Sequence, residues 1–241
     1  MMLKMEKNNI DDAISDAAPD MAHFLASSVH DMKNSVSMLI GGLEKTLATV
    51  DAASFPSYDG LVQMNLEAKR INDKLVQLLA LYKVGQNLYP FNPQFLSLHE
   101  YMQTIAAQNC DILKFQGIQL DIQVDRNLHW YFDEDMINGV VGNALNNATR
   151  YATTCINFSA KEVNGVLEIR IEDDGDGYPN EMLQTHIDNI RSIDFQAGST
   201  GLGIYFSSIV ARLHRNHGRY GGVKLENNGL LGGSCFILYL P

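Results

Sequence analysis

Two asparagines, Asn143 and Asn147, lie four residues apart in a stretch whose pattern predicts a helix from Asp133 to about Tyr151. Residues at this spacing share one face of a helix, so both amides are expected on the same side. An amide oxygen is a neutral ligand that suits a Mg²⁺ ion held mostly by phosphate groups and water. Asparagine on a helix is more commonly a solvated surface residue. The pair alone therefore does not indicate a metal site, and that interpretation depends on the segments that follow.

An acidic, glycine-rich turn, Asp173 to Gly177, follows an apolar strand predicted at Leu167 to Ile171. Its glycines allow the backbone to turn sharply and to approach a ligand closely. A carboxylate beside them can accept hydrogen bonds from an exocyclic amine. A solubilising β-turn or a calcium loop is the alternative. The EF-hand pattern fails, because no Glu follows at the required distance and the flanking segments are not typical of paired helices.

A third segment, Gly198 to Gly203, runs directly into a helix expected from Ile204 to His214. Glycines at the start of a helix leave backbone N–H groups exposed at the positive end of the helix dipole, and such a position binds anions such as phosphate. A glycine hinge at a loop tip is the alternative. The segment lacks the Gly-Lys-Ser/Thr ending of a Walker A loop and the preceding strand of a Rossmann fingerprint.

The elements that must position these segments begin after Pro93. Strands in runs, with helices between them and a hairpin at the end, predict an α+β sandwich. The predicted helices are 98–115, 133–151 and 204–214, and the predicted strands are 118–124, 154–159, 166–172, 222–227 and 234–240.

The first 90 residues predict a different structure, a two-helix antiparallel hairpin. From about Met21 apolar residues recur at alternating steps of four and three, which indicates a coiled-coil seam. Turn residues between Asp51 and Gly60 interrupt the pattern, which then restarts and ends at Gly85. Since no third layer in this sequence covers two seams, we expect dimerisation into a four-helix bundle. The seam residues are Leu25, Val29, Met32, Val36, Leu39, Leu43, Thr46 and Val50, then Leu61, Met64, Ala68, Ile71, Leu75, Leu78 and Tyr82.

Composition narrows the class of protein. The 241 residues are 46% hydrophobic, and 18 Lys and Arg against 28 Asp and Glu give a net charge of −10. Disorder, collagen and a small disulfide scaffold are excluded, and the acidic balance argues against a nucleic-acid partner. Three widely spaced cysteines, no signal peptide and no apolar run of about 18 residues lead us to expect a cytoplasmic chain without a membrane span.

In their order along the chain, the motifs resemble the ATP-binding domain of sensor histidine kinases, within the GHKL ATPase family. NALNNATRY matches the N box, DDGDG the first glycine box, GSTGLGIY the second, and GGSCFILYLP the closing hairpin. The resemblance covers about Pro93 to Pro241 and implies a GHKL (Bergerat) α/β sandwich with ATP and Mg²⁺ as cofactors. Hydrolytic relatives carry Glu at the position of Asn143, and an amide cannot take a proton from water. We therefore expect transfer of the γ-phosphoryl group and not its hydrolysis.

The resemblance also implies roles for single residues of the nucleotide site. Asn147 would contact Mg²⁺ with help from Asn143, and Asp173 would bond the adenine amine, with Ser234 supporting through water. Glycines would shape the pocket and its lid. The implied set is Asn143, Asn147, Arg150, Tyr151, Asp173, Gly175, Gly177, Thr200, Gly201, Leu202, Gly203 and Ser234.

The hairpin carries the segment His30-Asp31-Met32-Lys33-Asn34, which resembles the histidine box of the family's dimerisation and phosphotransfer domain. Ser35 and Val36 stand where that box has Pro and Leu. With Val29 at an a position of the heptad, His30 falls at b, outside the seam. The resemblance implies that His30 accepts the phosphoryl group, that Asp31 raises its nucleophilicity, and that Asn34 orients a water for dephosphorylation of a partner.

These expectations describe a two-component sensor histidine kinase core. Residues 1–19 would be an N-terminal segment, 20–90 the phosphotransfer hairpin and 91–241 the ATP-binding domain. Expected partners are a second copy of the chain, the receiver domain of a response regulator and a separate sensor protein. One alternative is a histidine phosphotransfer scaffold that no longer uses ATP. Another is an anti-sigma serine kinase, a family without the His30 hairpin.

Overall fold

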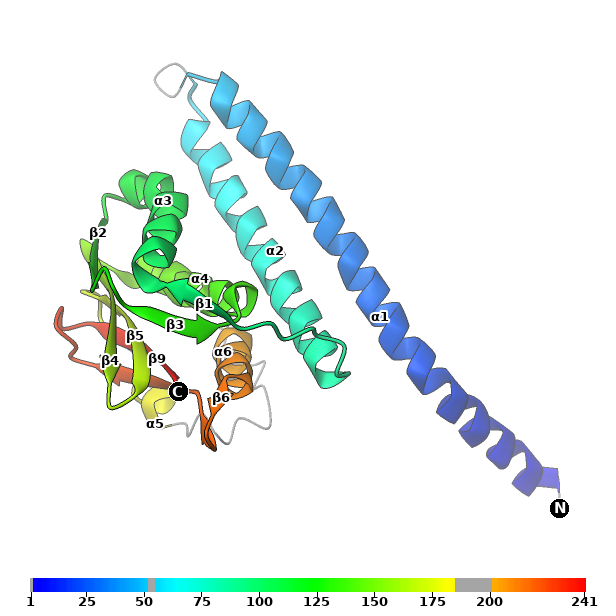
Figure 1. The fold of residues 1–241 in the computed structure, drawn as a ribbon. Helices are drawn as coiled ribbons and strands as arrows, with labels where there is room; N and C mark the ends of the chain where they lie inside the picture. Colours follow the sequence, from blue (N-terminus) through cyan, green and yellow to red (C-terminus); the bar gives the residue numbers. More distant parts are fainter. Residues whose placement is uncertain (1, 52–54, 185–200) are drawn as a thin grey trace. The chain divides into compact units, whose positions relative to one another are not determined.

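The computed structural model describes residues 2–51, 55–184 and 201–241 of the chain. The chain divides into two compact units, Met1–Tyr89 and Pro90–Pro241 (Figure 1). The first is helical and the second contains every strand of the described residues.

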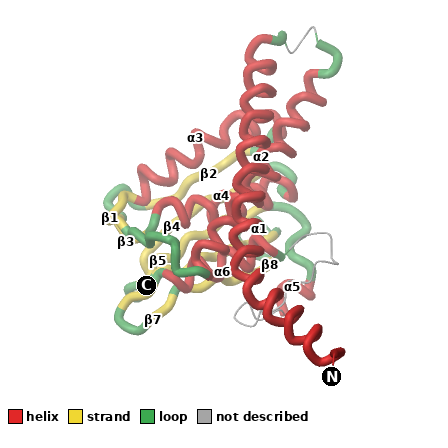
Figure 2. The backbone as a smooth tube through the Cα atoms, turned by 90° about the vertical axis from the view of Figure 1, so that its right-hand side faces the viewer, coloured by secondary structure: helices red, strands yellow, loops and turns green. Residues whose placement is uncertain are grey.

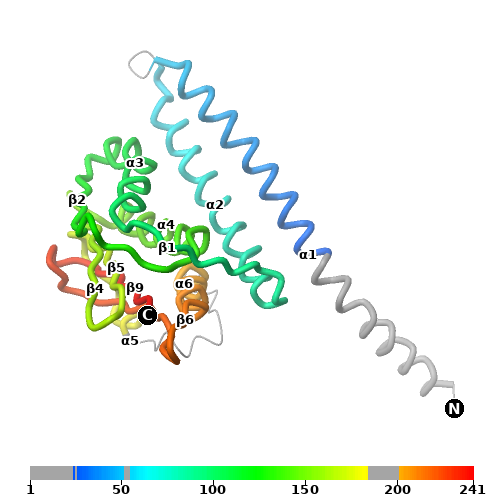
Figure 3. The backbone as a smooth tube through the Cα atoms, viewed as in Figure 1, coloured from blue at the N-terminus to red at the C-terminus, as the bar shows by residue number. Residues whose placement is uncertain are grey.

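Helices α1 (Met2–Thr49) and α2 (Tyr58–Gly85) form the hairpin of the first unit (Figure 3). The Ser37 hydroxyl donates to Asn72 Oδ1 at 3.3 Å, and Lys69 Nζ lies 2.7 Å from Glu44 Oε1. Since the later residue of α1 pairs with the earlier residue of α2, the helices run antiparallel, as predicted. α1 begins at Met2, whereas the sequence predicted a start near Met21. The prediction missed the first turns because the polar start of the chain has no apolar repeat that indicates a helix.

The hairpin covers only part of its predicted seam. Val29 is buried, whereas Met32 and Leu39 are 49% and 56% exposed. The same is true of α2, where the exposed seam residues are Met64, Ile71 and Leu78. Apolar surface on both helices is therefore left over after the two helices have packed together.

The second unit is built on a five-stranded sheet with the order β2-β4-β5-β9-β8. β2 and β4 are parallel, and the other neighbouring strands are antiparallel. The strands are β2 (Gln119–Val124), β4 (Cys155–Val163), β5 (Val166–Asp173), β8 (Gly222–Asn227) and β9 (Ser234–Leu240).

Three helices cover one face of this sheet (Figures 1 and 2): α3 (Leu98–Gln116), α4 (Glu134–Tyr151) and α6 (Leu202–Leu213). Phe158 and Ile171 are opposite each other on neighbouring strands and are fully buried, whereas the alternate residues Glu168 and Arg170 form an ion pair at 3.2 Å. Alternation of this kind buries one face of a sheet and leaves the other polar. The predicted α/β sandwich after a helical hairpin is therefore confirmed.

Local sequence signals fix the ends of the helices. The Ser97 hydroxyl accepts a hydrogen bond from Glu100 N at 3.3 Å, and Asp133 Oδ1 accepts one from Met136 N at 3.1 Å, so both residues act as N-caps. Gly117, with φ of 69°, ends α3 in the left-handed conformation. None of the described helices combines the length and the apolar character needed to span a membrane.

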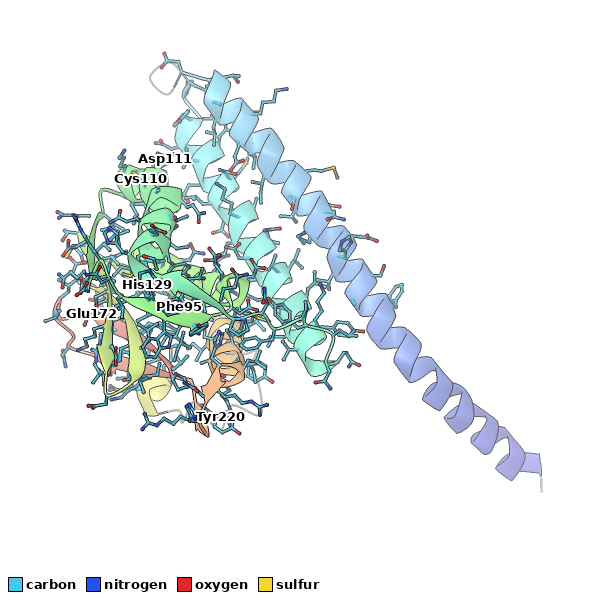
Figure 4. The ribbon with its side chains drawn as sticks, in the orientation of Figure 1. Phe95, Cys110, Asp111, His129, Glu172 and Tyr220 are labelled. Atoms are coloured by element: carbon cyan, nitrogen blue, oxygen red, sulfur yellow. The ribbon has the colours of Figure 1, made fainter. Side chains whose placement is uncertain are left out.

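Several short elements lie outside the sequence prediction, because two to five residues are too few to show a period. They are β1 (Gln94–Ser97) and β3 (His129–Phe132), which pair antiparallel, β6 (Arg215–Asn216) and β7 (Arg219–Tyr220), which form a hairpin, and α5 (Asn180–Gln184). On the β1–β3 pair, the rings of Phe95 and His129 stack with centroids 5.3 Å apart (Figure 4).

Candidate functional site

Asp173, at the end of β5, is the most completely bonded of the predicted site residues. Its side chain is 1% exposed, and Oδ1 accepts hydrogen bonds from Gly175 N at 2.9 Å and from Ser234 N at 3.2 Å. The Ser234 hydroxyl donates directly to Oδ2. Among the described residues no second donor reaches Oδ2, so this oxygen keeps a lone pair for a ligand. The neighbouring Glu172 (Figure 4) points to the other face of the sheet, where Asn157 Nδ2 donates to it at 2.9 Å.

The first glycine turn is packed tightly beneath the end of α4. A Cβ atom at Gly175 would collide with the carbonyl oxygen of Tyr151, so only glycine allows this approach. Tyr151 and Arg150 close α4, with the Arg150 guanidinium 5.4 Å from the centre of the Tyr151 ring. The structure therefore brings the end of the N box and the first glycine box together.

Asn143 and Asn147 occupy the side of α4 that its core does not use. Val140 and Ala144 are buried, whereas Asn143 is half-buried and Asn147 is exposed. Asn143 lies against Gly203 in the first turn of α6, so closely that a Cβ at Gly203 would overlap its amide. The N box and the second glycine box thus meet at this contact.

α6 begins without a side-chain cap. Gly201 precedes the helix and provides no capping side chain, so within the part of the chain that the structure describes no side chain caps the N–H groups of Leu202 and the next residues. Thr200, Ser199 and Gly198 lie outside the described residues, as does most of the segment between the glycine boxes, so the structure does not place Thr200.

His214 ties α6 to α4. Asp133 N donates to His214 Nε2 at 3.1 Å, and His214 Nδ1 donates to Val210 O at 2.8 Å, which requires the neutral tautomer. Burial lowers the pKa of His214 and favours this neutral form. The bond joins the N-cap of α4, the helix that carries Asn143, to the C-cap of α6, the helix that carries Gly203.

Asp174 has a structural role that differs from that of its neighbour. Its carboxylate accepts hydrogen bonds from the backbone nitrogens of Thr153, Thr154 and Cys155 at 2.8 to 3.2 Å. Burial opposes ionisation, but these bonds and one from the Thr154 hydroxyl hold the pKa of Asp174 well below its usual range. Asp176 is exposed. The two aspartates of the acidic turn therefore have different roles: Asp173 faces the site, and Asp174 fastens β4 to β5.

Tyr178 and Asn227 belong to the site although the sequence did not indicate them. Asn227 Oδ1 accepts from Tyr178 N at 2.7 Å, and Asn227 Nδ2 donates to Tyr178 O at 2.9 Å. Burial, with a contribution from the nearby charge of Asp173, raises the pKa of Tyr178 to about 12. No local signal could have joined two residues 49 positions apart, and only the position of Asn227 at the end of a predicted strand placed it near the edge of the sheet.

His30, in the first unit, has an exposed side chain beside two polar neighbours. Its exposure is 61%, and Nδ1 lies 3.7 Å from Asp31 Oδ1 and 3.3 Å from Asn34 Nδ2. Ser35 donates to Asp31 O at 3.0 Å, and α1 continues through it. Among the described residues none bonds Nε2, so this nitrogen is accessible.

The site residues fit a nucleotide with a weakly held metal ion. Asp173 offers a lone pair at the base of the site, α6 offers uncapped N–H groups, and Asn147 offers an exposed amide oxygen. Within the described ranges no three His, Cys, Asp or Glu side chains gather as a metal cluster. Such a donor set suits Mg²⁺ that arrives with phosphates, because few of its ligands then come from the protein.

Comparisons with known proteins agree with this geometry. Residues 132–241 match a family described as histidine kinase-, DNA gyrase B-, and HSP90-like ATPase. The chain is 26% identical over 240 residues to the sensor protein SrrB of Staphylococcus aureus strain N315, and the match covers 90% of this chain and 37% of SrrB. The SrrB proteins of strains NCTC 8325 and COL match over the same shares. The chain thus spans 37% of the length of these relatives.

Solved structures show the same fold at lower identity. The Acinetobacter baumannii histidine kinase AdeS superposes with a TM-score of 0.58 at 19% identity, covering 88% of this chain and 96% of AdeS. Full-length ShkA in complex with AMPPNP gives a TM-score of 0.61 at 16% identity, covering 90% of this chain and 45% of ShkA.

Proposed function

We propose that the chain is an ATP-dependent protein-histidine kinase. Residues 132–241 match the histidine kinase-, DNA gyrase B- and HSP90-like ATPase family, and the chain shares the fold of a solved histidine kinase. The chain phosphorylates itself on His30 and passes the phosphoryl group to an aspartate of a response regulator.

The burial and incomplete hydrogen bonding of the Asp173 carboxylate are the main support for nucleotide binding. The carboxylate is fully buried yet has donors for only part of its accepting capacity, and Oδ2 receives a single protein bond. A buried acceptor of this kind favours a ligand with an exocyclic amine, because it would otherwise be left partly unpaired. The adenine amine meets that requirement.

The phosphate end of the nucleotide would lie between α4 and α6. The uncapped N–H groups after Gly201 suit phosphate oxygens. Asn147 would hold Mg²⁺, which when bound offsets phosphate charge. Asn143, pressed against Gly203, is an amide and cannot serve as a general base toward water. The γ-phosphoryl group therefore needs another acceptor.

His30 has the chemistry of that acceptor. The Nε2 lone pair forms the new N–P bond while the bond from the γ-phosphorus to the bridging oxygen breaks and ADP leaves. The imidazole then carries an extra proton, and Asp31, 3.7 Å from Nδ1, can accept it. The exposed position of His30 on α1 leaves room for a bulky phosphoryl donor and for later access by a regulator.

The uncovered apolar surface of the hairpin supports dimerisation. Met32, Leu39 and Ile71 are each about half exposed on a pair of helices, and packing against a second hairpin would bury them in a four-helix bundle. A separate sensor protein would supply the input signal.

A phosphotransfer assay tests the proposal. The chain is incubated with γ-labelled ATP and Mg²⁺, freed of nucleotide, and mixed with a purified receiver domain whose aspartate is intact or replaced by alanine. We expect label to enter the chain and then to move to the intact receiver alone. A chain that never acquires label but accepts phosphate from a phosphorylated receiver would favour the scaffold that no longer uses ATP.

A further inference from the structure

A cavity of about 390 Å³ lies on the polar face of the five-stranded sheet. Its lining includes Glu172 (Figure 4) and Arg170 of β5, Ser159 and Lys161 of β4, and Leu230 of the turn between β8 and β9. Glu172 and Arg170 alternate along β5 with the buried Ile171, so they face away from the three helices. Asp173, the next residue, lies on the helix-covered side, so this cavity is separate from the candidate nucleotide site.

The Glu172 end of the cavity carries a buried negative charge without a cation. The side chain is 1% exposed, Oε2 accepts a hydrogen bond from Asn157 Nδ2 at 2.9 Å, and Oε1 accepts one from Leu230 N at 3.3 Å. Both donors are neutral, and no Lys, Arg or His of the described residues forms an ion pair with this carboxylate. Because a buried carboxylate without a cation is costly, this end favours a ligand that brings a positive charge.

Asn157 leaves an acceptor open beside that carboxylate. It lies opposite Glu172 on β4 and is 3% exposed, and within the described part of the chain its Oδ1 has no hydrogen-bond partner. The other end of the same amide is bonded to Glu172, so the open oxygen lies close to the carboxylate. An ammonium group has three N–H donors and can bond both oxygens at once.

The other end of the cavity carries an excess of positive charge. Arg170 Nη2 lies 3.2 Å and Lys161 Nζ 3.9 Å from the same oxygen, Glu168 Oε2. Two cations therefore share one carboxylate. The Arg170 guanidinium has five N–H donors, and only Nε and Nη2 donate to Glu168, so it can also hold a second carboxylate. Arg170 is two residues from Glu172 on one strand, about 7 Å along it, so the opposite charges are neighbours.

We propose that this cavity binds a small zwitterion of the free α-amino acid class, with its ammonium held by Glu172 and Asn157 Oδ1 and its carboxylate held by Arg170. A bare cation would leave the excess positive charge at Arg170 unmet, and a simple anion would be repelled by the Glu172 carboxylate. Leu230 lines the same cavity and is exposed, so it offers contact to an apolar side chain of the ligand. None of the residues assigned to the nucleotide holds this ligand, so the inference does not rest on the proposed function.

The test measures binding of the standard L-amino acids to the whole chain without nucleotide. Thermal melting at millimolar ligand finds those that bind, and calorimetry then gives their dissociation constants. The N-acetyl derivative of the tightest binder lacks the ammonium, and its carboxamide lacks the carboxylate. We expect at least one amino acid to bind, and each derivative to bind at least roughly 10-fold more weakly, because one charge-assisted contact is lost.

Two variants locate the ligand in the cavity. Glu172→Gln keeps the shape of the side chain but removes its charge, and Arg170→Gln removes the guanidinium. Each should weaken binding of the amino acid at least roughly 10-fold. Lys224→Gln is the matched control, because it removes an exposed cation from β8 on the same face of the sheet, and it should bind like the wild type.

The proposal is overturned if no amino acid binds, or if the tightest binder keeps its affinity in Glu172→Gln or in Arg170→Gln. Acetylation or amidation without loss of affinity would overturn it as well. If thermal melting shows that Glu172→Gln is unfolded, Arg170→Gln and the two derivatives decide. Because these measurements contain no nucleotide, a negative result leaves the proposed kinase activity untouched.

Discussion

The Asp174 carboxylate accepts hydrogen bonds from both the hydroxyl and the backbone nitrogen of Thr154, with Oδ2 2.6 Å from Oγ1 and 2.9 Å from N. Thr154 immediately precedes β4 and Asp174 immediately follows β5, so the contact fastens the ends of two strands beside the proposed nucleotide site. Donors on both oxygens favour the ionised carboxylate, because a protonated acid would lose accepting capacity at one of them.

This contact predicts a pH dependence of stability. The pKa of Asp174 is lowered in the folded state, so its stabilisation is complete above the ordinary aspartate pKa near 4 and is lost as pH falls toward the folded-state pKa. Asp174→Asn should lower the urea midpoint at neutral pH, and the deficit should shrink below about pH 4. Asp176→Asn, an exposed change in the same turn, is the control. A deficit that stays constant from neutral to acid pH would contradict this role.

Asp173→Asn should weaken ATP binding. The amide can accept from the adenine amine only on one side, and its NH₂ group would face donors that now bond the carboxylate. Loss of a charge-assisted bond and an unpaired donor together correspond to about 1 to 3 kcal/mol, or roughly 5- to 150-fold in affinity. Calorimetry measures the change. Unchanged affinity, or an equal loss in Asp176→Asn, would remove Asp173 from adenine recognition.

Ile71→Glu should dissociate the expected dimer. Ile71 is 48% exposed on α2, and a carboxylate enclosed there without a partner would cost on the order of 3 to 5 kcal/mol. Light scattering should give the wild type twice the 26.8 kDa chain mass and the variant about one chain mass. Lys74→Glu, a change of exposed charge on the same helix, should remain dimeric. A wild type that elutes at 26.8 kDa would exclude the bundle.

Asn34→Ala should separate two activities of the hairpin. Asn34 lies one helical turn from His30, with its Nδ2 3.3 Å from Nδ1, so its amide can orient a water beside a regulator docked at His30. We expect the variant to label on His30 like the wild type yet to slow the loss of phosphate from a phosphorylated regulator. Ser35→Ala provides a neighbouring control. Identical decay with wild type, variant and no kinase at all would mean that the chain has no phosphatase activity.

Much of the fold could be predicted because its long elements carry clear periods. The order of the main helices and strands, the antiparallel hairpin and the sandwich follow from apolar repeats and turn residues. The start of α1 and the β1–β3 pair could not be predicted, because a polar segment and four-residue strands show no repeat.

The contacts of the candidate site could also be predicted only in part. Asp173 and Ser234 are brought into contact by the pairing of β5 with β9, as the motif order suggests. The bond between Tyr178 and Asn227 depends on a turn and a strand end that meet only in the folded chain, so no local pattern indicates it. Thr200 lies outside the described residues, and its role stays a prediction.

The central claim, that His30 accepts the phosphoryl group, is tested most directly by finding which residue carries the label and whether the label is stable in acid or in alkali. The wild type, His30→Ala and His129→Ala, which changes an exposed histidine of the ATP-binding unit, are incubated with γ-labelled ATP and Mg²⁺ and then treated with acid or alkali. We predict label that is lost in acid and stable in alkali on the wild type and on His129→Ala, no label on His30→Ala, and equal ATP affinity in all three. Alkali-stable label that persists on His30→Ala, or a wild type that binds ATP and carries no label, would contradict the assignment of His30 as the phosphoacceptor.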